Sequence, residues 1–327
     1  MVVFLLLAGC AATGPPAVVP ELEPIVVEAR PLPALALPEP AVQPAPRRQT
    51  PRADIALVVD TTAPAHAAVA DEIEAALPPR RYRVERLPAT AAPELEALRS
   101  KHVTVIAVGP EAVLAARTAL PDKPLVFCQV PAYDSALQAG APIWGVQTLP
   151  PLELQLKSWQ SIDPSLRTVA LIVSASGAPL AEEAQRAASS LAADLLVETS
   201  ASDRETLYLF RRLAAAVDGL WLLPDNAALS PAVLRELLTL AATRSVGVLT
   251  FNEALLSRGA LMTATAVPAD VAATVAHVLE RVVAGQTADL PAMTPLSAAA
   301  LAVNVDVASA LGLPPIAVAR WVAREPD

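Results

Sequence analysis

Residues 103–108 read Val-Thr-Val-Ile-Ala-Val, and after Gly109-Pro110 the chain continues with an alanine- and leucine-rich stretch over residues 111–120. The first run is apolar at nearly every position, which is typical of a strand that is buried on both faces of its sheet. Strands of this kind belong to parallel sheets whose two faces are covered by helices. The stretch therefore predicts a strand followed by a helix in an α/β fold.

The same alternation of apolar strand and alanine-rich helix repeats along the chain from residue 53 onward. We expect ten strands, at residues 55–60, 82–87, 103–108, 125–129, 143–147, 169–174, 195–199, 219–223, 246–251 and 260–265. Helices are expected at residues 66–77, 111–120, 152–162, 180–192, 204–217, 231–243 and 271–284. Ten strands are too many for one compact sheet, and the Gln147–Pro151 segment, which ends in two prolines, divides them into two sets of five.

This order predicts an α/β protein of two doubly wound parallel-sheet lobes joined by a hinge. Lobe 1 is expected to comprise residues 53–147 and about 268–290, and lobe 2 residues 148–267. The helix at 271–284 follows the complete second lobe, so we expect it to return to the first and to add a crossing to the hinge. Residues 291–327 predict a C-terminal strand and helix segment, and the sequence leaves open which lobe it joins.

Composition limits what a chain of 327 residues can do. A hydrophobic share of 54% with 17% charged residues is typical of a folded protein with a sizeable core. No uninterrupted apolar run reaches the ~18 residues of a membrane-spanning helix. The 24 basic and 33 acidic side chains give a net charge of −9, and no long basic block exists, so nucleic acid is not an expected partner. Two cysteines, Cys10 and Cys128, exclude a disulfide framework and a cysteine-rich metal site.

The N-terminus resembles the lipobox of bacterial lipoproteins, because a short apolar stretch ends in Leu7-Ala8-Gly9-Cys10. The resemblance implies a signal over residues 1–9 and acyl chains on Cys10, with each buried CH₂ contributing about 0.8 kcal/mol to membrane affinity. The protein is then expected in the bacterial cell envelope, held there by its lipid anchor alone and facing the periplasm or exterior. The alternative is a hydrophobic terminus in which Cys10 is incidental, since the stretch lacks a basic start and a longer apolar core.

Residues 10–52 are predicted to be a disordered tether behind the lipidated cysteine. Between Pro15 and Pro51 there are 11 prolines among 37 residues, without helical or strand periodicity. Proline-rich chain extends at roughly 3.1 Å per residue, so the segment could hold a folded body up to about 100 Å from a membrane. A linker of this kind supports the lipobox interpretation, because a tether has a purpose only if its N-terminal end is attached to something fixed, such as a membrane.

Five segments resemble the ABC-transporter substrate-binding family of type I periplasmic binding fold that includes tryptophan/tyrosine-type binding lipoproteins. They are residues 105–114, 124–130, 218–226, 257–263 and 303–313, which read VIAVGPEAVL, PLVFCQV, DGLWLLPDN, SRGALMT and VNVDVASALGL. The resemblance covers nearly all of the folded part. It implies a solute-binding protein that delivers a small, amino-acid-like molecule to an ABC permease.

Several positions depart from the family's pattern where the ligand would lie. Pro110 stands where a small hydroxyl residue is common, and the Ser174–Ser176 run where an aromatic-Asn-Pro turn is usual. Asn252, Ala264 and Val267 replace a usual Asp, Tyr and Asp. These departures keep an alternative open: a binding-fold lipoprotein without a transport role, acting as an interaction or regulatory module for an envelope enzyme or receptor.

Ligands of doubly wound lobes lie beyond the carboxyl ends of the strands, which selects particular loops. The candidate ligand-binding residues are Thr61, Gly109, Gln129, Tyr133, Ser174, Ser176, Asp225, Asn226, Phe251 and Asn252. An amino-acid-like ligand would find amides at Ser176-Gly177, a carboxylate at Asp225, and walls at Tyr133 and Phe251.

The same residues could instead have purely structural roles. Asp225 could bond its own turn backbone, and Phe251 could be a core residue at the end of a strand. Asn252 and Glu253 could cap the short helix that follows.

No catalytic or metal-binding pattern stands out. The three histidines lie on separate predicted elements, and no Gly-x-Ser-x-Gly, Walker, Gly-x-Gly-x-x-Gly or His-Glu-x-x-His motif occurs. Cys128 lies in an apolar strand, where a thiol behaves as a small hydrophobe. We therefore expect a binding protein without enzyme activity, metal or cofactor, whose partners are a small-molecule ligand and an ABC permease or other envelope protein.

Overall fold

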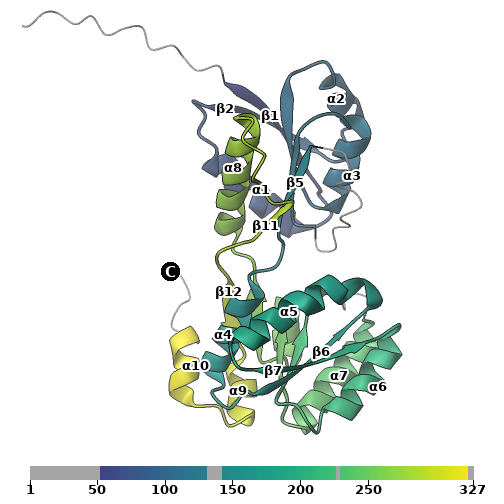
Figure 1. Ribbon diagram of the computed structural model, residues 1–327, viewed down its shortest axis with the longest axis vertical. Coiled ribbons are helices and arrows are strands. Elements are labelled where there is room, and N and C mark those ends of the chain that lie inside the picture. Colours follow the sequence, from purple (N-terminus) through teal and green to yellow (C-terminus); the bar gives the residue numbers. More distant parts are fainter. Residues whose placement is uncertain (1–51, 131–141, 226–228, 323–327) are drawn as a thin grey trace, which may run out of the picture. The chain divides into compact units, whose positions relative to one another are not determined.

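The computed structural model describes residues 52–130, 142–225 and 229–322 of the chain (Figure 1). These residues form two α/β lobes, each built on a six-stranded sheet. The predicted fold class, two doubly wound parallel-sheet lobes, is confirmed. No helix in the described ranges is both long and apolar enough to span a bilayer.

Lobe 1 is built on the sheet with strand order β11-β5-β4-β3-β1-β2. Its strands are β1 (Ala53–Val59), β2 (Tyr82–Pro88), β3 (Val103–Val108), β4 (Leu125–Cys128), β5 (Ile143–Val146) and β11 (Met293–Thr294). Its helices are α1 (Pro64–Ala76), α2 (Ala92–Ala97), α3 (Pro110–Ala119) and α8 (Pro268–Val283).

Lobe 2 repeats this order as β12-β10-β9-β8-β6-β7. Its strands are β6 (Thr168–Val173), β7 (Asp194–Thr199), β8 (Gly219–Leu222), β9 (Gly247–Thr250), β10 (Met262–Thr265) and β12 (Ala300–Val303). Its helices are α4 (Leu152–Ile162), α5 (Ala178–Ser190), α6 (Asp203–Leu213), α7 (Pro231–Thr243), α9 (Val305–Ala310) and α10 (Pro315–Val322), with short 3₁₀ turns η2 (Ala175–Gly177) and η4 (Glu253–Arg258).

Each sheet has one strand more than the five that the sequence assigns to it, and both extra strands lie in residues 291–327, where the sequence predicts a single strand and leaves its lobe open. Residues 293–294 add β11 beside β5, and residues 300–303 add β12 beside β10. The β10–β12 pair is antiparallel, whereas the other strand pairs described are parallel. Two residues are too few to show a period, and the alanines of β12 are poor strand formers, so neither strand has a clear sequence signal.

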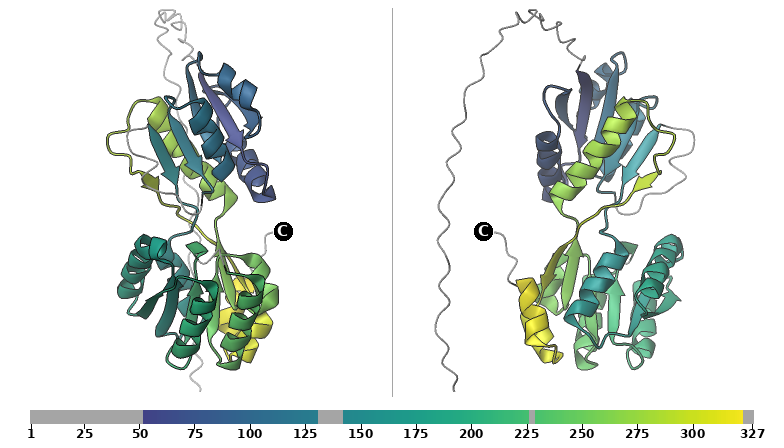
Figure 2. Two further views of the ribbon diagram at one scale, coloured as in Figure 1. Left: turned by 90° about the vertical axis from the view of Figure 1, so that its right-hand side faces the viewer. Right: turned by 60° about the vertical axis from the view of Figure 1, so that its left-hand side comes forward.

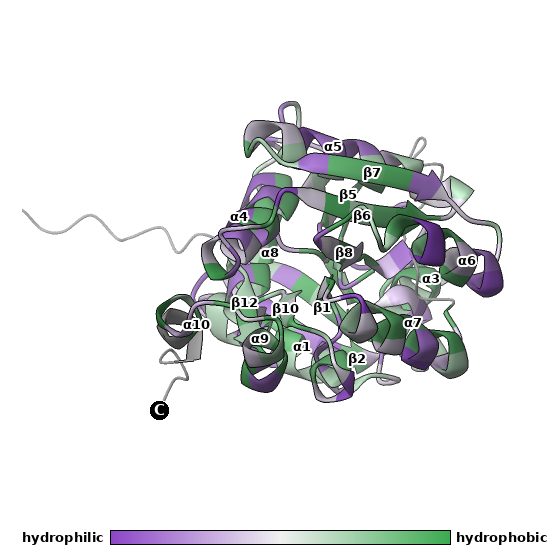
Figure 3. Ribbon diagram, turned by 90° about the horizontal axis from the view of Figure 1, so that it is seen from below, coloured by the Kyte–Doolittle hydropathy of each residue, from purple (hydrophilic) through white to green (hydrophobic). Residues whose placement is uncertain are grey.

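Alternate residues of a strand enter separate cores, which is why the strands are apolar throughout. Ile55, Leu57 and Val59 of β1 pack in the core with α1 and α8. Ala56 and Val58 pack on the opposite face, in the core with α2 and α3. Sheets covered on both faces in this way require continuous apolar strands. Figure 3 shows the result, with strands mostly green and purple concentrated on helices such as α6 and α7.

Helix α8 belongs to lobe 1 although it follows β6 to β10 of lobe 2 (Figure 2). Val271, Val275 and Val278 are fully buried in the core that also contains Ile73 of α1. The chain therefore passes between the lobes after β5, after β10 and again between β11 and β12.

The last of these crossings is anchored by Asp270, in the first turn of α8. Its carboxylate accepts hydrogen bonds from the Ser297 amide at 2.9 Å, the Ser297 hydroxyl at 2.5 Å and the Ala298 amide at 3.0 Å. Burial alone would raise the pKa of Asp270, but these hydrogen bonds outweigh it and lower that pKa. The connection between β11 and β12 is thus tied by an ionised side chain to the helix that returns to lobe 1.

Candidate functional site

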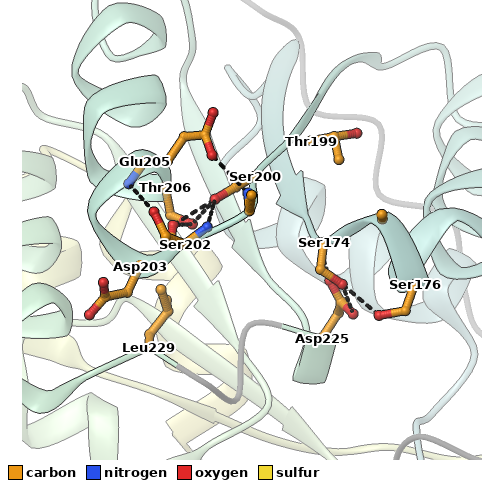
Figure 4. Close-up of a pocket in the computed structure, with 12 residues that line it drawn as sticks. Ser174, Ser176, Thr199, Ser200, Ser202, Asp203, Glu205, Thr206, Asp225 and Leu229 are labelled. Atoms are coloured by element: carbon orange, nitrogen blue, oxygen red, sulfur yellow. Dashed lines mark hydrogen bonds between the residues drawn. The ribbon is translucent and has the colours of Figure 1, made fainter.

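A pocket of about 560 Å³ opens at the carboxyl ends of β6, β7 and β8 in lobe 2 (Figure 4). We call it the lobe 2 pocket; its lining is Ser174, Ala175, Ser176, Thr199, Ser200, Ala201, Ser202, Asp203, Glu205, Thr206, Asp225 and Leu229. Its volume lies within the roughly 300–1,000 Å³ that small-molecule sites occupy. Its position is the one at which doubly wound sheets bind ligands.

Asp225 joins two neighbouring strands at this edge. It follows β8, and its Oδ2 accepts a hydrogen bond from the Ser174 amide, which follows β6. Its Oδ1 accepts a second from the Ser174 hydroxyl at 2.8 Å, and that hydroxyl also pairs with the Ser176 hydroxyl at 2.7 Å. The carboxylate therefore bonds a partner across the sheet. We call this arrangement the lobe 2 clamp.

Gly177 makes room for the clamp. A Cβ atom at this position would lie 2.6 Å from Cγ and 2.6 Å from Oδ2 of Asp225, well inside contact distance. A side chain here would push the carboxylate away from Ser174. The glycine is therefore explained by the space that Asp225 needs, and it is not by itself evidence for a ligand.

The turn from β7 into α6 forms the other wall of the pocket. Ser202 is the N-cap of α6 and accepts from the Glu205 amide at 3.3 Å, while Glu205 Oε2 accepts from the Ala201 amide at 2.8 Å. The pair resembles a capping box, which a Ser-x-x-Glu sequence predicts, but Glu205 bonds the amide one residue before the N-cap, and the Ser202 amide bonds the Ser200 hydroxyl at 3.3 Å. The buried hydroxyls of Ser200 and Thr206 pair with each other at 2.8 Å. The wall is thus rigid and rich in hydroxyl groups.

Asp203 lies at the start of the same helix. A hydrogen bond from the Ser230 hydroxyl lowers its pKa, with smaller contributions from the Arg204 and Ser230 amides and from the charge of Arg204. The Asp203 carboxylate is therefore ionised at neutral pH.

The corresponding edge of lobe 1 is organised around Asp60, which follows β1 and is 2% exposed. Its Oδ1 accepts from the Thr62 amide at 2.8 Å and the Thr62 hydroxyl at 2.6 Å, and its carboxylate also accepts from the Glu111 amide of α3. Burial alone would raise the pKa of Asp60, but these hydrogen bonds and the nearby His66 lower it. We call this arrangement the lobe 1 clamp.

Gly109 fits against the lobe 1 clamp. Its φ of 94° lies in the region that favours glycine, and a Cβ atom there would lie 2.7 Å from the Asp60 Cβ and 2.7 Å from the His66 Cε1. His66 Nδ1 lies 3.1 Å from the Asp60 backbone oxygen. The turn between β3 and α3 is therefore packed directly on Asp60 and His66.

The remaining candidates lie elsewhere on the two edges. Thr61 is exposed and lines a separate hollow of about 340 Å³ in lobe 1. Gln129 follows β4 with a φ of 60°, a strained conformation that is uncommon outside glycine. Asn252 caps η4, since its Oδ1 accepts from the Ala254 amide at 3.0 Å. Phe251 follows β9 and is half-buried.

The structure thus brings Ser174, Ser176 and Asp225 together in one pocket, and does not bring Phe251 or Asn252 into that lining. The predictions for Tyr133, Asn226 and Cys10 lie outside the described residues.

The residues described contain no cluster of three or more His, Cys, Asp or Glu side chains that could hold a metal ion. Cys128 is buried and unpaired, and burial raises the pKa of its thiol to about 12. A thiol of this kind stays protonated and unreactive at neutral pH.

No protein-family model matches the sequence, and no curated protein matches it. Solved structures do match. The chain has the type I periplasmic-binding-protein fold.

Three structures show the extent of the likeness to this fold. The ligand-free, open structure of a substrate-binding protein with adhesive properties from Clostridium difficile has a TM-score of 0.60 at 15% identity, over 80% of this chain and 95% of that one. An ABC domain in complex with L-Trp from Streptococcus pneumonia has 0.54 at 15%, over 83% and 98%. A conserved domain protein from Vibrio cholerae has 0.52 at 16%, over 83% and 98%. At these identities the comparison shows the fold alone.

Within this fold, sequence reasoning missed two groups at the strand ends. It omitted the turn after β7, although Thr199-Ser200-Ala201-Ser202-Asp203 is a polar run directly after a strand. It also assigned none of the three histidines to a site, whereas the His66 side chain packs beside Asp60 and Gly109. The signal for the first group was present, because a run of hydroxyl residues at a carboxyl edge has the chemistry of a binding loop.

Proposed function

We propose that this protein is an envelope-anchored solute-binding lipoprotein of an ABC-type uptake system, which binds a small, amino-acid-like molecule between its two lobes. The lobe 2 pocket carries the proposal, since it is a ligand-sized cavity at the strand ends where this fold binds solutes. The neighbours that are named as substrate-binding or as holding L-Trp support the same role. In this proposal Cys10 carries the lipid, residues 10–52 span the distance to the body, and an ABC permease receives the solute.

Asp225 is the proposed partner of the ligand's ammonium group. Its two oxygens accept from Ser174, but a carboxylate has about four acceptor positions, so the clamp leaves capacity for a ligand. Asp225 is half-buried and lines the pocket, so its charge is open to the cavity.

The proposal is tested by a thermal-shift screen of amino acids and related solutes on the full-length protein, followed by calorimetry with Asp225→Asn. Removing one member of a buried charge pair costs about 2–5 kcal/mol, or roughly 30- to 5,000-fold in affinity. Ser174→Ala is the matched control, because it removes one clamp hydrogen bond and keeps the charge. A change below threefold in Asp225→Asn, or equal losses in both variants, would remove Asp225 from the ligand site.

A second candidate function is an interaction or regulatory module for another envelope protein. It is favoured because two residues predicted to bind a ligand have structural roles. Asn252 caps η4, and both Asp225 oxygens accept hydrogen bonds from Ser174. A ligand at 100 times its dissociation constant should stabilise the fold by ~2.7 kcal/mol. If no solute in the screen raises the melting temperature, this second function is preferred.

A further inference from the structure

The charged side chains that line the lobe 2 pocket are all acidic. They are Asp203, Glu205 and Asp225, and no Lys, Arg or His lines the pocket among the described residues. None of the three carboxylates has a basic side chain within ion-pair distance in that part of the chain. The pocket therefore has a negative charge that nothing in its own lining compensates.

The start of α6 does not reverse this charge. A helix N-terminus attracts anions through its free amides and its dipole. Here Ser202 accepts from the Glu205 amide and Glu205 accepts from the Ala201 amide, while Asp203 and Glu205 place two negative charges in the first turn. An anionic group would meet these carboxylates and would find the capping amides already bonded.

The neutral part of the lining also narrows the ligand class. It consists of five hydroxyl residues besides Ser174, together with two alanines and Leu229, and none of the described lining residues is aromatic. Indole and sugar rings are usually held by aromatic walls, so this lining does not favour them. Carboxylates and hydroxyls accept hydrogen bonds readily, and an ammonium group offers three donors and no acceptor.

We propose that the lobe 2 pocket binds a small organic cation with more than one ammonium group, held by Asp203, Glu205 and Asp225. This inference rests on the proposed solute-binding function and specifies the charge of the solute. The acidic pocket selects such a ligand over neutral and anionic molecules of the same length, because each ammonium group pairs with a carboxylate that has no basic partner within ion-pair distance among the described residues.

The test is calorimetry on the full-length protein with four compounds built on the same five-carbon chain. The probes are 1,5-diaminopentane, 1-aminopentane, 1,5-pentanediol and glutarate. We expect the diamine to bind at least about tenfold more tightly than the monoamine, and the diol and the dianion to bind more weakly still. Equal affinity for diamine and diol, or preference for glutarate, would overturn the inference.

The variant Glu205→Gln tests whether the diamine binds in the lobe 2 pocket. The amide keeps an oxygen for the Ala201 amide and removes the charge, so the melting temperature should change little while the affinity for the diamine falls about tenfold. Glu182→Gln is the matched control, since Glu182 is exposed on α5 and outside the pocket lining. Equal losses in the two variants, or no loss in Glu205→Gln, would exclude the pocket as the cation's site.

The same titration is run with L-norleucine, which separates this inference from the proposed function. Binding of norleucine without binding of the diamine would leave a solute-binding protein and overturn the cation preference. If neither compound nor any solute of the thermal-shift screen binds, both proposals are wrong.

Discussion

In both lobes an aspartate carboxylate at the end of one central strand accepts a hydrogen bond from a backbone amide beyond the neighbouring strand. The two lobes differ in which of the two strands carries the aspartate. In lobe 1, Asp60 follows β1 and accepts from the Glu111 amide, beyond β3. In lobe 2, Asp225 follows β8, the counterpart of β3, and accepts from the Ser174 amide, beyond β6, the counterpart of β1. Each donor turn contains a glycine, Gly109 or Gly177, whose missing Cβ makes space for the aspartate.

Because the direction is reversed, the hydrogen-bonded carboxylate serves to join the carboxyl ends of the two central strands, and either strand can supply it. An aspartate at a strand end is therefore weak evidence for a ligand by itself. The clamps differ in access: Asp60 is 2% exposed, whereas Asp225 is half-buried and lines a pocket. The lobe 2 clamp thus combines its structural role with contact to a solute-sized space.

The largest difference between the clamps is expected at their glycines. Gly109→Ala adds the cost of a side chain at positive φ, ~1–2 kcal/mol, to the ~1–3 kcal/mol of overpacking against Asp60 and His66. Gly177→Ala has an ordinary φ of −81° and should cost only the overpacking. Urea unfolding of the two variants measures the difference. Equal costs would show that backbone strain contributes nothing to the comparison.

The next largest loss of stability is expected when the charge of Asp60 in the lobe 1 clamp is removed. Asp60→Asn replaces hydrogen bonds to a charged acceptor, each contributing about 1.5–3 kcal/mol, with weaker neutral ones. Because the folded-state pKa of Asp60 is lowered, its contribution is present above the unfolded value near 3.9 and is lost as the pH falls through the folded value.

Unfolding of wild type and Asp60→Asn across pH 2–7 checks this sign. The stability gap between the two proteins should be constant near neutrality and should close under acid. A gap that widens as the pH falls would contradict the lowered pKa.

The smallest effects are expected from the clamp hydroxyls. Thr62→Val removes the 2.6 Å bond to Asp60, and Ser174→Ala removes the 2.8 Å bond to Asp225, while the backbone amides of both residues still bond those carboxylates. Each change should cost about 1 kcal/mol, with the larger loss in lobe 1, where Asp60 is less exposed. The melting temperatures of the two variants rank these losses, and a larger loss in Ser174→Ala would reverse the ranking of the clamps.

Much of the architecture could be predicted from the sequence because it depends on local pattern. Runs such as residues 103–108 are apolar at successive positions, which only a sheet covered on both faces requires. A strand was expected within residues 291–327 but not located at Ala300–Val303, and helix α2 at Ala92–Ala97 escaped prediction, because segments this short show no distinct period. The start of α1 was placed at His66 because Pro64, which suits the first turn, was not used as a boundary signal.

The candidate site was less predictable because its contacts are distant in sequence. Asp225 could be selected as a strand-end carboxylate, but its partner Ser174 lies 51 residues away, and no local pattern pairs them. His66 lies in the first turn of α1, and its contact with Gly109 exists only because β1 and β3 are neighbours in the sheet. Asn252, in contrast, was correctly given a capping alternative, since that contact spans two residues.

The place of α8 and β11 in lobe 1 also affects the order in which the protein can fold. A chain made from its N-terminus completes β1 to β5 early, yet the face of that sheet beneath Val271, Val275 and Val278 stays uncovered until ten strands have been synthesised. The last strand of lobe 1, Met293–Thr294, and the last of lobe 2, Ala300–Val303, then emerge almost together. Both lobes therefore reach their full sheets at nearly the same moment, and until then the nascent chain exposes an apolar face for chaperones to protect.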